Sequence, residues 1–216
     1  MEKINKIKAI IFDMDNTLLQ SNIDFYALKH DIFDYLISNH ILTQEFPILE
    51  HTSSTMIEYA KQIGITDELY QDMMNIAANH EIVGMKGAGL EPGVSELLES
   101  LYTKFILVVI TNNSLIAARQ ALETTKIIDY IDLIIGREQM SSLKPSPSGF
   151  LFALEQFKHI PLNEWISIGD SWIDGKASMD AGIPFISYRT STEKMINRGV
   201  RPVGQINNII EILDFI

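Results

Sequence analysis

The chain has 216 residues, and 46% of them are hydrophobic, which is enough for a sizeable buried core and excludes a disordered protein. Its 17 basic and 28 acidic residues leave a net charge of −11, which argues against nucleic-acid or anionic-membrane partners, because both bind clustered lysine and arginine. The absence of cysteine excludes disulfides, thiolate catalysis and cysteine-based zinc sites.

No apolar run approaches the roughly 18 residues of a membrane-spanning helix. Residues 1–6, Met-Glu-Lys-Ile-Asn-Lys, lead directly into the first apolar run without a hydrophobic leader. We therefore expect a cytoplasmic protein with no membrane association, either a monomer or a homodimer.

Residues 7–12 are an apolar run, which predicts a strand that is buried on both faces, as in a parallel sheet covered by helices. Residues 22–86 carry apolar side chains at helical spacing, which predicts three or four helices and no strand. The glycine-containing run 84–89 predicts a flexible hinge before ordered structure resumes.

From residue 94 onward, helical and strand patterns alternate. We expect helices over residues 94–102, 115–124, 147–157, 174–181 and 206–213, and strands over 105–110, 131–135, 165–168 and 184–188. Ser146 is a candidate N-cap for the 147–157 helix, with Pro147 in its first position. The alternation predicts an α/β fold, a Rossmann-like parallel sheet core wound by right-handed crossovers.

A helical insertion interrupts this predicted core. Residues 1–20 and 87–216 would form the core domain, and residues 21–86 would form a small α-helical cap domain. Because the insertion follows the first strand, we expect it to lie over the carboxyl edge of the sheet, where α/β folds place their sites.

Polar side chains follow four of the predicted strands. They are Asp13 and Asp15, then Thr111 and Asn112, then Lys144, and finally Asp170 and Asp174. Each group alone has a simpler explanation: a chance Asp-x-Asp, a helix N-cap cluster, a solvated lysine, or a turn with a helix cap. Their joint occurrence in this order favours a functional site, because two carboxylates at one sheet edge are costly unless a cation or a reaction needs them.

The same residues resemble the four motifs of the haloacid dehalogenase-like hydrolase superfamily. The matches are Asp-x-Asp-x-Thr at 13–17, Thr111, Lys144 and Gly-Asp-x-x-x-Asp at 169–174. Weaker similarities at 91–94, 144–147 and 181–184 resemble the branch with a small helical cap, which includes phosphoglycolate phosphatase-like and β-phosphoglucomutase-like enzymes.

The resemblance implies a role for each carboxylate. Asp13 would be the nucleophile that forms an aspartyl-phosphate, and Asp15 would protonate the leaving alcohol and then deprotonate the attacking water. Asp13, Asp170 and Asp15, the last through its backbone carbonyl, would ligate Mg²⁺. Asp174 would hold those ligands in place without binding the ion itself.

The remaining motif residues would bind the substrate's phosphate. Thr111, the backbone amide of Asn112, and Lys144 would contact the phosphoryl oxygens. Haloacid dehalogenases typically lack the second aspartate, so Asp15 favours phosphoryl transfer over carbon–halogen hydrolysis. We therefore expect a Mg²⁺-dependent phosphomonoester hydrolase acting on a small phosphorylated metabolite, phosphoglycolate-like.

Other functions remain open at this point. A β-phosphoglucomutase-like phosphomutase would use the same intermediate, although such mutases commonly carry glycine where this chain has Asn16. A phospho-accepting receiver module is about half this length and has no cap, and a non-catalytic binding protein usually lacks one of the motif carboxylates. In the insertion, His51, Tyr59, His80 and Lys86 either reach the substrate or serve only in packing or at the surface.

Overall fold

The computed structural model describes residues 7–216. The expectation that no leader is present concerns residues 1–6 and lies outside the described residues. None of the described helices is both long and apolar enough to cross a membrane.

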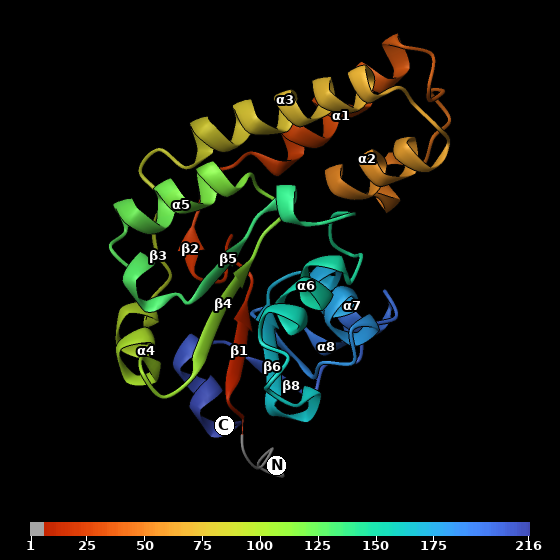
Figure 1. Cartoon of the computed structure of the whole chain (residues 1–216). Coiled ribbons are helices and arrows are strands. Elements are labelled where there is room, and N and C mark those ends of the chain that lie inside the picture. Colours follow the sequence, from red (N-terminus) through yellow and green to blue (C-terminus); the bar gives the residue numbers. More distant parts are fainter. Residues whose placement is uncertain (1–6) are drawn as a thin grey trace.

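The core is a six-stranded, wholly parallel sheet in the order β5-β4-β1-β6-β7-β8, which confirms the predicted α/β fold (Figure 1). Its strands are β1 (Ala9–Phe12), β4 (Ile106–Ile110), β5 (Leu133–Ile135), β6 (Trp165–Gly169), β7 (Phe185–Tyr188) and β8 (Gly204–Ile206). The first strand lies in the middle of the sheet, so residues directly after β1 emerge at the centre of its carboxyl edge.

Both faces of the sheet are covered, as the apolar strands require. Alternate residues of β1 point to opposite sides: Ile10 and Phe12 join one hydrophobic cluster, and Ala9 and Ile11 join another. The first cluster is completed by α4 (Val94–Leu101), α5 (Leu115–Thr124) and η5 (Ile209–Asp214), and the second by α6 (Ser148–Gln156) and α7 (Trp172–Asp180).

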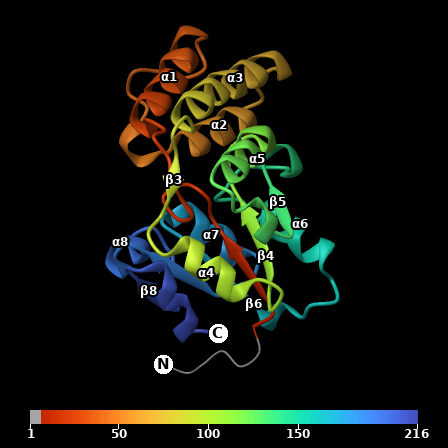
Figure 2. The same cartoon turned by 90° about the vertical axis from the view of Figure 1, so that its left-hand side faces the viewer.

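Three helices lie above the carboxyl edge of the sheet: α1 (Phe25–Ser38), α2 (Ser53–Gln62) and α3 (Asp67–Gly84), with the single turn η1 (Ile48–Glu50) between the first two (Figures 1 and 2). This agrees with the predicted three or four helices. Their N-caps are Asp24, Thr52 and Thr66, each of which accepts a hydrogen bond from a first-turn amide.

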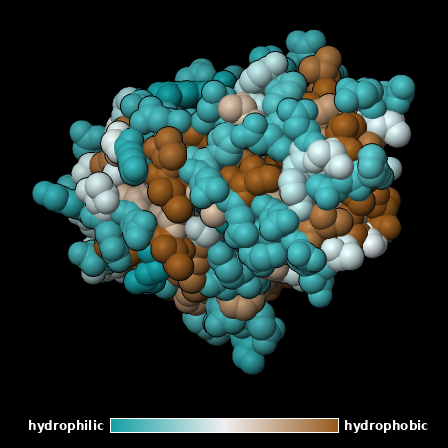
Figure 3. Space-filling model, turned by 90° about the horizontal axis from the view of Figure 1, so that it is seen from above, coloured by the Kyte–Doolittle hydropathy of each residue, from teal (hydrophilic) through white to brown (hydrophobic). Residues whose placement is uncertain are grey.

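The three helices pack around their own hydrophobic cluster, which also takes in Leu143 from the sheet's side of the molecule. Seen from above these helices, the surface is mostly hydrophilic, with apolar residues in separate groups (Figure 3). The helices are therefore held together by an interior of their own and by a seam with the loop that carries Lys144.

The two chain segments that connect these helices to the sheet pair with each other. β2 (Leu19–Gln20) and β3 (Gly89–Leu90) form a short antiparallel ladder. The run 84–89, predicted as a flexible hinge, includes the last residue of α3, Gly84, a turn over residues 85–87, and the first residue of β3, Gly89. The entry and exit of the helical segment thus lie side by side.

Several predicted elements differ from the structure. The predicted 206–213 helix is wrong, because Ile206 ends β8 and a 3₁₀ helix, η5, follows from Ile209. The short helix α8 (Thr192–Ile196) and β8 were not predicted. The 147–157 helix begins at Ser148, with Pro147 and not Ser146 in the N-cap position.

Candidate active site

The first two carboxylates follow β1 at a tight turn. Asp13 stays tied to the sheet, because its backbone amide donates to the Ile168 carbonyl at 2.9 Å. Asn16 then adopts a left-handed conformation (φ 56°), and its amide donates to the Leu19 carbonyl at 2.7 Å. Asparagine and glycine both tolerate this conformation, so the backbone conformation alone accounts for Asn16. The residue at this position therefore does not show whether water or a sugar accepts the phosphoryl group.

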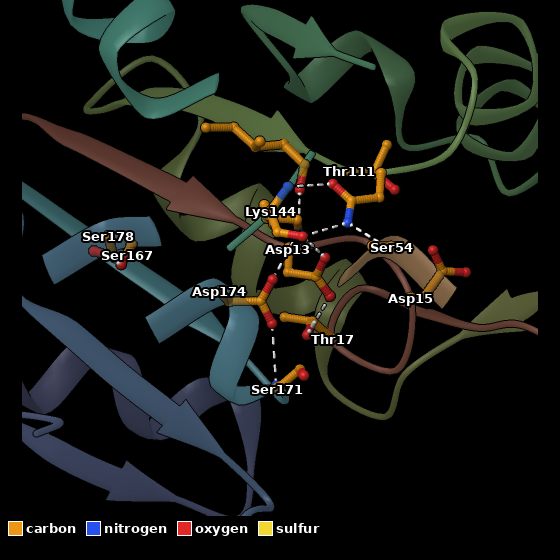
Figure 4. A network of polar contacts seen from close by, with 12 residues as sticks. Asp13, Asp15, Thr17, Ser54, Thr111, Lys144, Ser167, Ser171, Asp174 and Ser178 are labelled. Carbon is orange, nitrogen blue, oxygen red and sulfur yellow. Dashed lines mark hydrogen bonds and ion pairs between the residues drawn. The ribbon is translucent and has the colours of Figure 1, made fainter. Parts of the chain in front are cut away.

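Lys144 lies between two of the motif carboxylates. Its Nζ donates to Asp13 Oδ1 at 2.6 Å, to Asp174 Oδ1 at 2.7 Å and to the Ile110 carbonyl at 2.8 Å (Figure 4). Burial alone would lower the pKa of Lys144, but the charges of Asp13 and Asp174 outweigh it and raise the pKa above its ordinary value. The lysine is therefore a permanent cation that fixes both carboxylates.

Asp170 joins the two carboxylates that Lys144 binds. Asp13, Asp170 and Asp174 each offer an oxygen, and these oxygens lie within 4.8 Å of one another. Burial, followed by the nearby charge of Asp13, raises the pKa of Asp170 to about 8 and that of Asp174 to about 6. Such crowding of buried negative charge is what a divalent cation with oxygen ligands would relieve, so the donor set fits Mg²⁺.

Asp174 is held in place by the start of its own helix. The Ser171 amide donates to Asp174 Oδ2 at 3.0 Å, which leaves Oδ1 for Lys144. Sequence reasoning placed the helix start at Asp174, but α7 begins two residues earlier, at Trp172. Asp174 therefore lies in the first turn of α7, where the helix dipole favours a negative charge.

Asp15 stands apart from the Asp13–Lys144–Asp174 group (Figure 4). Its Oδ2 accepts a hydrogen bond from Asn113 Nδ2 at 2.7 Å, and its Oδ1 is buried without a hydrogen-bond partner among the described residues. Burial, and then the charge of Asp13, raises the pKa of Asp15 to about 7. Asp15 can therefore exist in both protonation states near neutral pH.

The loop after β4 makes contacts that the sequence did not predict. Asn112 accepts from the Lys144 amide through Oδ1 at 2.8 Å, and its Nδ2 donates to Ser54 Oγ of α2 at 2.9 Å. Thr111 is buried, and its hydroxyl accepts from the Asn113 amide at 3.1 Å. The side chain of Asn112 thus joins three parts of the site.

A cavity of about 440 Å³ opens over these residues. Asp13, Asp15, Asn112, Lys144, Asp170 and Asp174 line it, whereas Thr111 is buried and does not line it. Its opposite wall comes from the helical segment and includes Phe25, Tyr26, Lys29, His51, Thr52, Ser53 and Ser54.

Of the four candidate residues in the helical segment, only His51 lines this cavity. Tyr59 packs against Phe46, with ring centroids 5.4 Å apart, and His80 is paired with Asp31 at 2.7 Å. Lys86 is exposed. Sequence reasoning missed Lys29 and Asn113; Asn113 could have been found from its place beside Thr111, whereas nothing in the sequence around Lys29 indicates that it faces a site.

A buried lysine lies among acidic side chains at the carboxyl edge of a parallel sheet, and such a site can bind and react with charged groups. A family model described as "Haloacid dehalogenase-like hydrolase" matches residues 10–188. The chain therefore belongs to the haloacid dehalogenase-like hydrolase family, which confirms the resemblance carried by its motifs.

Curated relatives and solved structures agree with this assignment. The chain is 26% identical to a phosphoglycolate phosphatase of Rhodobacter capsulatus over 197 residues, covering 86% of each chain. It is 25% identical to pyrophosphatase PpaX of Listeria monocytogenes over 182 residues, covering 82% of this chain and 80% of the relative. A hydrolase from Pseudomonas syringae shares the fold with a TM-score of 0.71 and 21% identity, and the match covers 96% of both chains.

Proposed function

We propose that the protein is a Mg²⁺-dependent phosphatase that acts on a small phosphorylated metabolite through an aspartyl-phosphate on Asp13. The observation that carries the proposal is the pairing of a lysine-bound carboxylate, Asp13, with a separate carboxyl group, Asp15, on the wall of one cavity. The phosphatase names of two relatives support it.

The chemistry needs two carboxylates in different states. In the first step, a carboxylate oxygen of Asp13 forms a bond to phosphorus while the bond to the leaving oxygen breaks, and Asp15 gives that oxygen its proton. In the second step, Asp15 takes a proton from water, the water oxygen bonds to phosphorus, and Asp13 is released. The pKa of Asp15, about 7, suits a group that must both give and take a proton.

The acidic group of Asp13, Asp170 and Asp174 is where Mg²⁺ would be held, with the backbone carbonyl of Asp15 as the further ligand implied by the family motif. When bound, Mg²⁺ would neutralise charge on the phosphoryl oxygens. Asp174 would orient the site more than bind the ion, as the family motif implies, with its two oxygens held by Lys144 and by the Ser171 amide.

Lys144, the Asn112 amide and Thr111 would bind the phosphoryl group, with Thr111 the least direct because it does not line the cavity. We further propose that residues 21–86 act as a cap domain over a core of residues 1–20 and 87–216. In support, the helices of this segment supply the wall of the cavity that faces Asp13.

The test is phosphate release from a panel containing phosphoglycolate, pyrophosphate, 2-hydroxyethyl phosphate and sugar phosphates, with and without Mg²⁺. Mg²⁺-dependent release that Asp13→Asn abolishes is the expected result. A folded, Mg²⁺-binding protein that releases no phosphate from any compound would contradict a phosphatase, and transfer to an added sugar acceptor instead of water would make it a phosphomutase.

A further inference from the structure

The cavity that contains Asp13 holds a second lysine, Lys29, on the opposite wall. Lys29 belongs to the first turns of α1, and together with Phe25 and Tyr26 it lines the cavity. Its side chain is half-buried, and Nζ reaches only the Ile48 carbonyl, at a long 3.4 Å.

The two cationic side chains of the cavity differ in what they already bind. Lys144 is held by Asp13 and Asp174, so its charge is balanced within the protein. Lys29 forms no ion pair with any carboxylate among residues 7–216. A half-buried ammonium without a counter-charge, in a chain with 28 acidic residues, is available to bind an anion.

His51 adds a polar group to the same wall. Its Nδ1 is buried and has no hydrogen-bond partner among the described residues, while its ring packs against Phe46 with centroids 4.6 Å apart. Burial lowers the pKa of His51, so the ring is neutral near pH 7 and offers one donor and one acceptor. Together, Lys29 and His51 make this end of the cavity suitable for a charged oxygen group.

Resting on the proposed function, we propose that Lys29, assisted by His51, binds a second anionic group on the non-reacting end of the substrate. The substrate class is therefore a small phosphorylated compound that carries a further carboxylate or phosphate, and not a neutral sugar phosphate. The volume of about 440 Å³ limits the substrate to a small molecule whose two charged ends meet the sheet edge and α1.

The experiment compares substrates that differ only in that second group. Phosphoglycolate carries a carboxylate where 2-hydroxyethyl phosphate carries a neutral hydroxymethyl group, and pyrophosphate tests phosphate as the second anion. Each is assayed with wild type, Lys29→Met, and Lys29→Arg, which retains the charge. Lys158→Met is the matched control, because Lys158 is 79% exposed and lies outside the cavity.

We expect Lys29→Met to lower kcat/KM for an anion-bearing substrate by about 10- to 100-fold, mainly through KM, and to change the value for 2-hydroxyethyl phosphate less than about twofold. A lower kcat/KM for phosphoglycolate alone identifies the second anionic group as a carboxylate. A lower kcat/KM for pyrophosphate alone identifies it as a phosphate. Lys29→Arg should recover most of the loss, and Lys158→Met should behave as wild type. An equal loss for all three substrates, or none for any, would overturn the proposal.

A binding measurement separates this proposal from the proposed function. Calorimetric titration of phosphoglycolate, pyrophosphate and 2-hydroxyethyl phosphate into Asp13→Asn, with and without Lys29→Met, requires no turnover. A wild type that hydrolyses nothing would contradict the phosphatase alone. The anion site would still be supported if phosphoglycolate or pyrophosphate bound more tightly than 2-hydroxyethyl phosphate and Lys29→Met abolished the difference. Equal affinity of all three compounds would contradict the anion site.

Discussion

Glu81 of α3 and Arg137, in the turn after β5, form a buried ion pair between the helical segment and the sheet. The two side chains are 3% and 9% exposed. Glu81 Oε2 also accepts from the Ser114 amide at 3.1 Å, and Arg137 Nη1 donates to the Asn112 carbonyl at 3.4 Å. The pair therefore stabilises the loop that contains Asn112 and Asn113 through hydrogen bonds to its backbone.

Breaking this pair should destabilise the protein more than removing it whole. Arg137→Met leaves the Glu81 carboxylate buried without a cation, and we expect it to lower the free energy of unfolding by about 3–5 kcal/mol. Glu81→Leu should cost less, because Arg137 keeps the exposed Glu138 carboxylate at 3.9 Å. The double variant should lose clearly less than the sum, because no buried charge remains. Urea denaturation of the four proteins measures this cycle, and additive losses would contradict a direct pairing.

Asp15→Asn should slow catalysis without preventing Mg²⁺ binding. The amide cannot give a proton to the leaving oxygen, so alkyl phosphates should lose about 10²–10⁴-fold in kcat. An aryl phosphate, whose phenolate leaves readily without a proton, should lose less in the phosphorylation step. Single-turnover rates with both ester types test this, and an equal loss for the two would argue against Asp15 as the general acid.

The metal-free protein should be more stable at pH 5.5 than at pH 8.5 through its buried carboxyl groups. Folding raises the pKa of Asp174, Asp15 and Asp170 from 3.8 to about 6, 7 and 8. Each folded-state carboxyl group thus holds its proton more tightly than the unfolded chain does. The resulting stability is fully present below pH 3.8 and is lost as the pH rises through about 6 to 8.

Thermal unfolding in EDTA across this pH range measures the effect. Added Mg²⁺ should raise Tm more at pH 8.5 than at pH 5.5, because the ion competes with protons for the same oxygens. A Tm increase from Mg²⁺ that does not depend on pH would argue against Asp170 and Asp174 as parts of its binding site.

Gly169→Ala should disturb Asp174. A Cβ at position 169 would lie 2.6 Å from Asp174 Cβ and from its Oδ2, closer than atoms can approach. We expect a loss of about 1–3 kcal/mol in stability together with weaker Mg²⁺ binding. Gly89→Ala is the control, because nothing lies within 4 Å of its Cβ. Normal Mg²⁺ affinity in Gly169→Ala would show that Asp174 can move without consequence.

Much of the core and the motif cluster was predictable, and for a physical reason. Parallel strands all end at one edge, so the residues after β1, β4 and β6 had to meet once the strands were recognised. The prediction failed at the C-terminal end: residues 206–213 are apolar enough for a helix, but Ile206 pairs with Tyr188 in the sheet, and Asn208 starts a new turn by accepting from the Ile210 amide.

Contacts between the helical segment and the sheet could not be predicted from the sequence. Lys29, Glu81 and Arg137 show no local pattern that separates them from ordinary surface charges. Their positions depend on how α1 and α3 are placed over the sheet, which arises from packing between residues far apart in the chain. The division of the chain into a core domain and a cap domain stays a prediction.

The pairing of β2 with β3 has a consequence for how such a segment can vary. Gln20 and Gly89 are aligned partners in the ladder, so the long insertion is closed at its base. Closing a loop costs chain entropy that grows only logarithmically with length, by about 0.6 kcal/mol for each doubling. Lengthening the connections between the helices of this segment therefore adds little loop-closure cost, provided that the helices keep their own cluster and their buried contacts with the sheet.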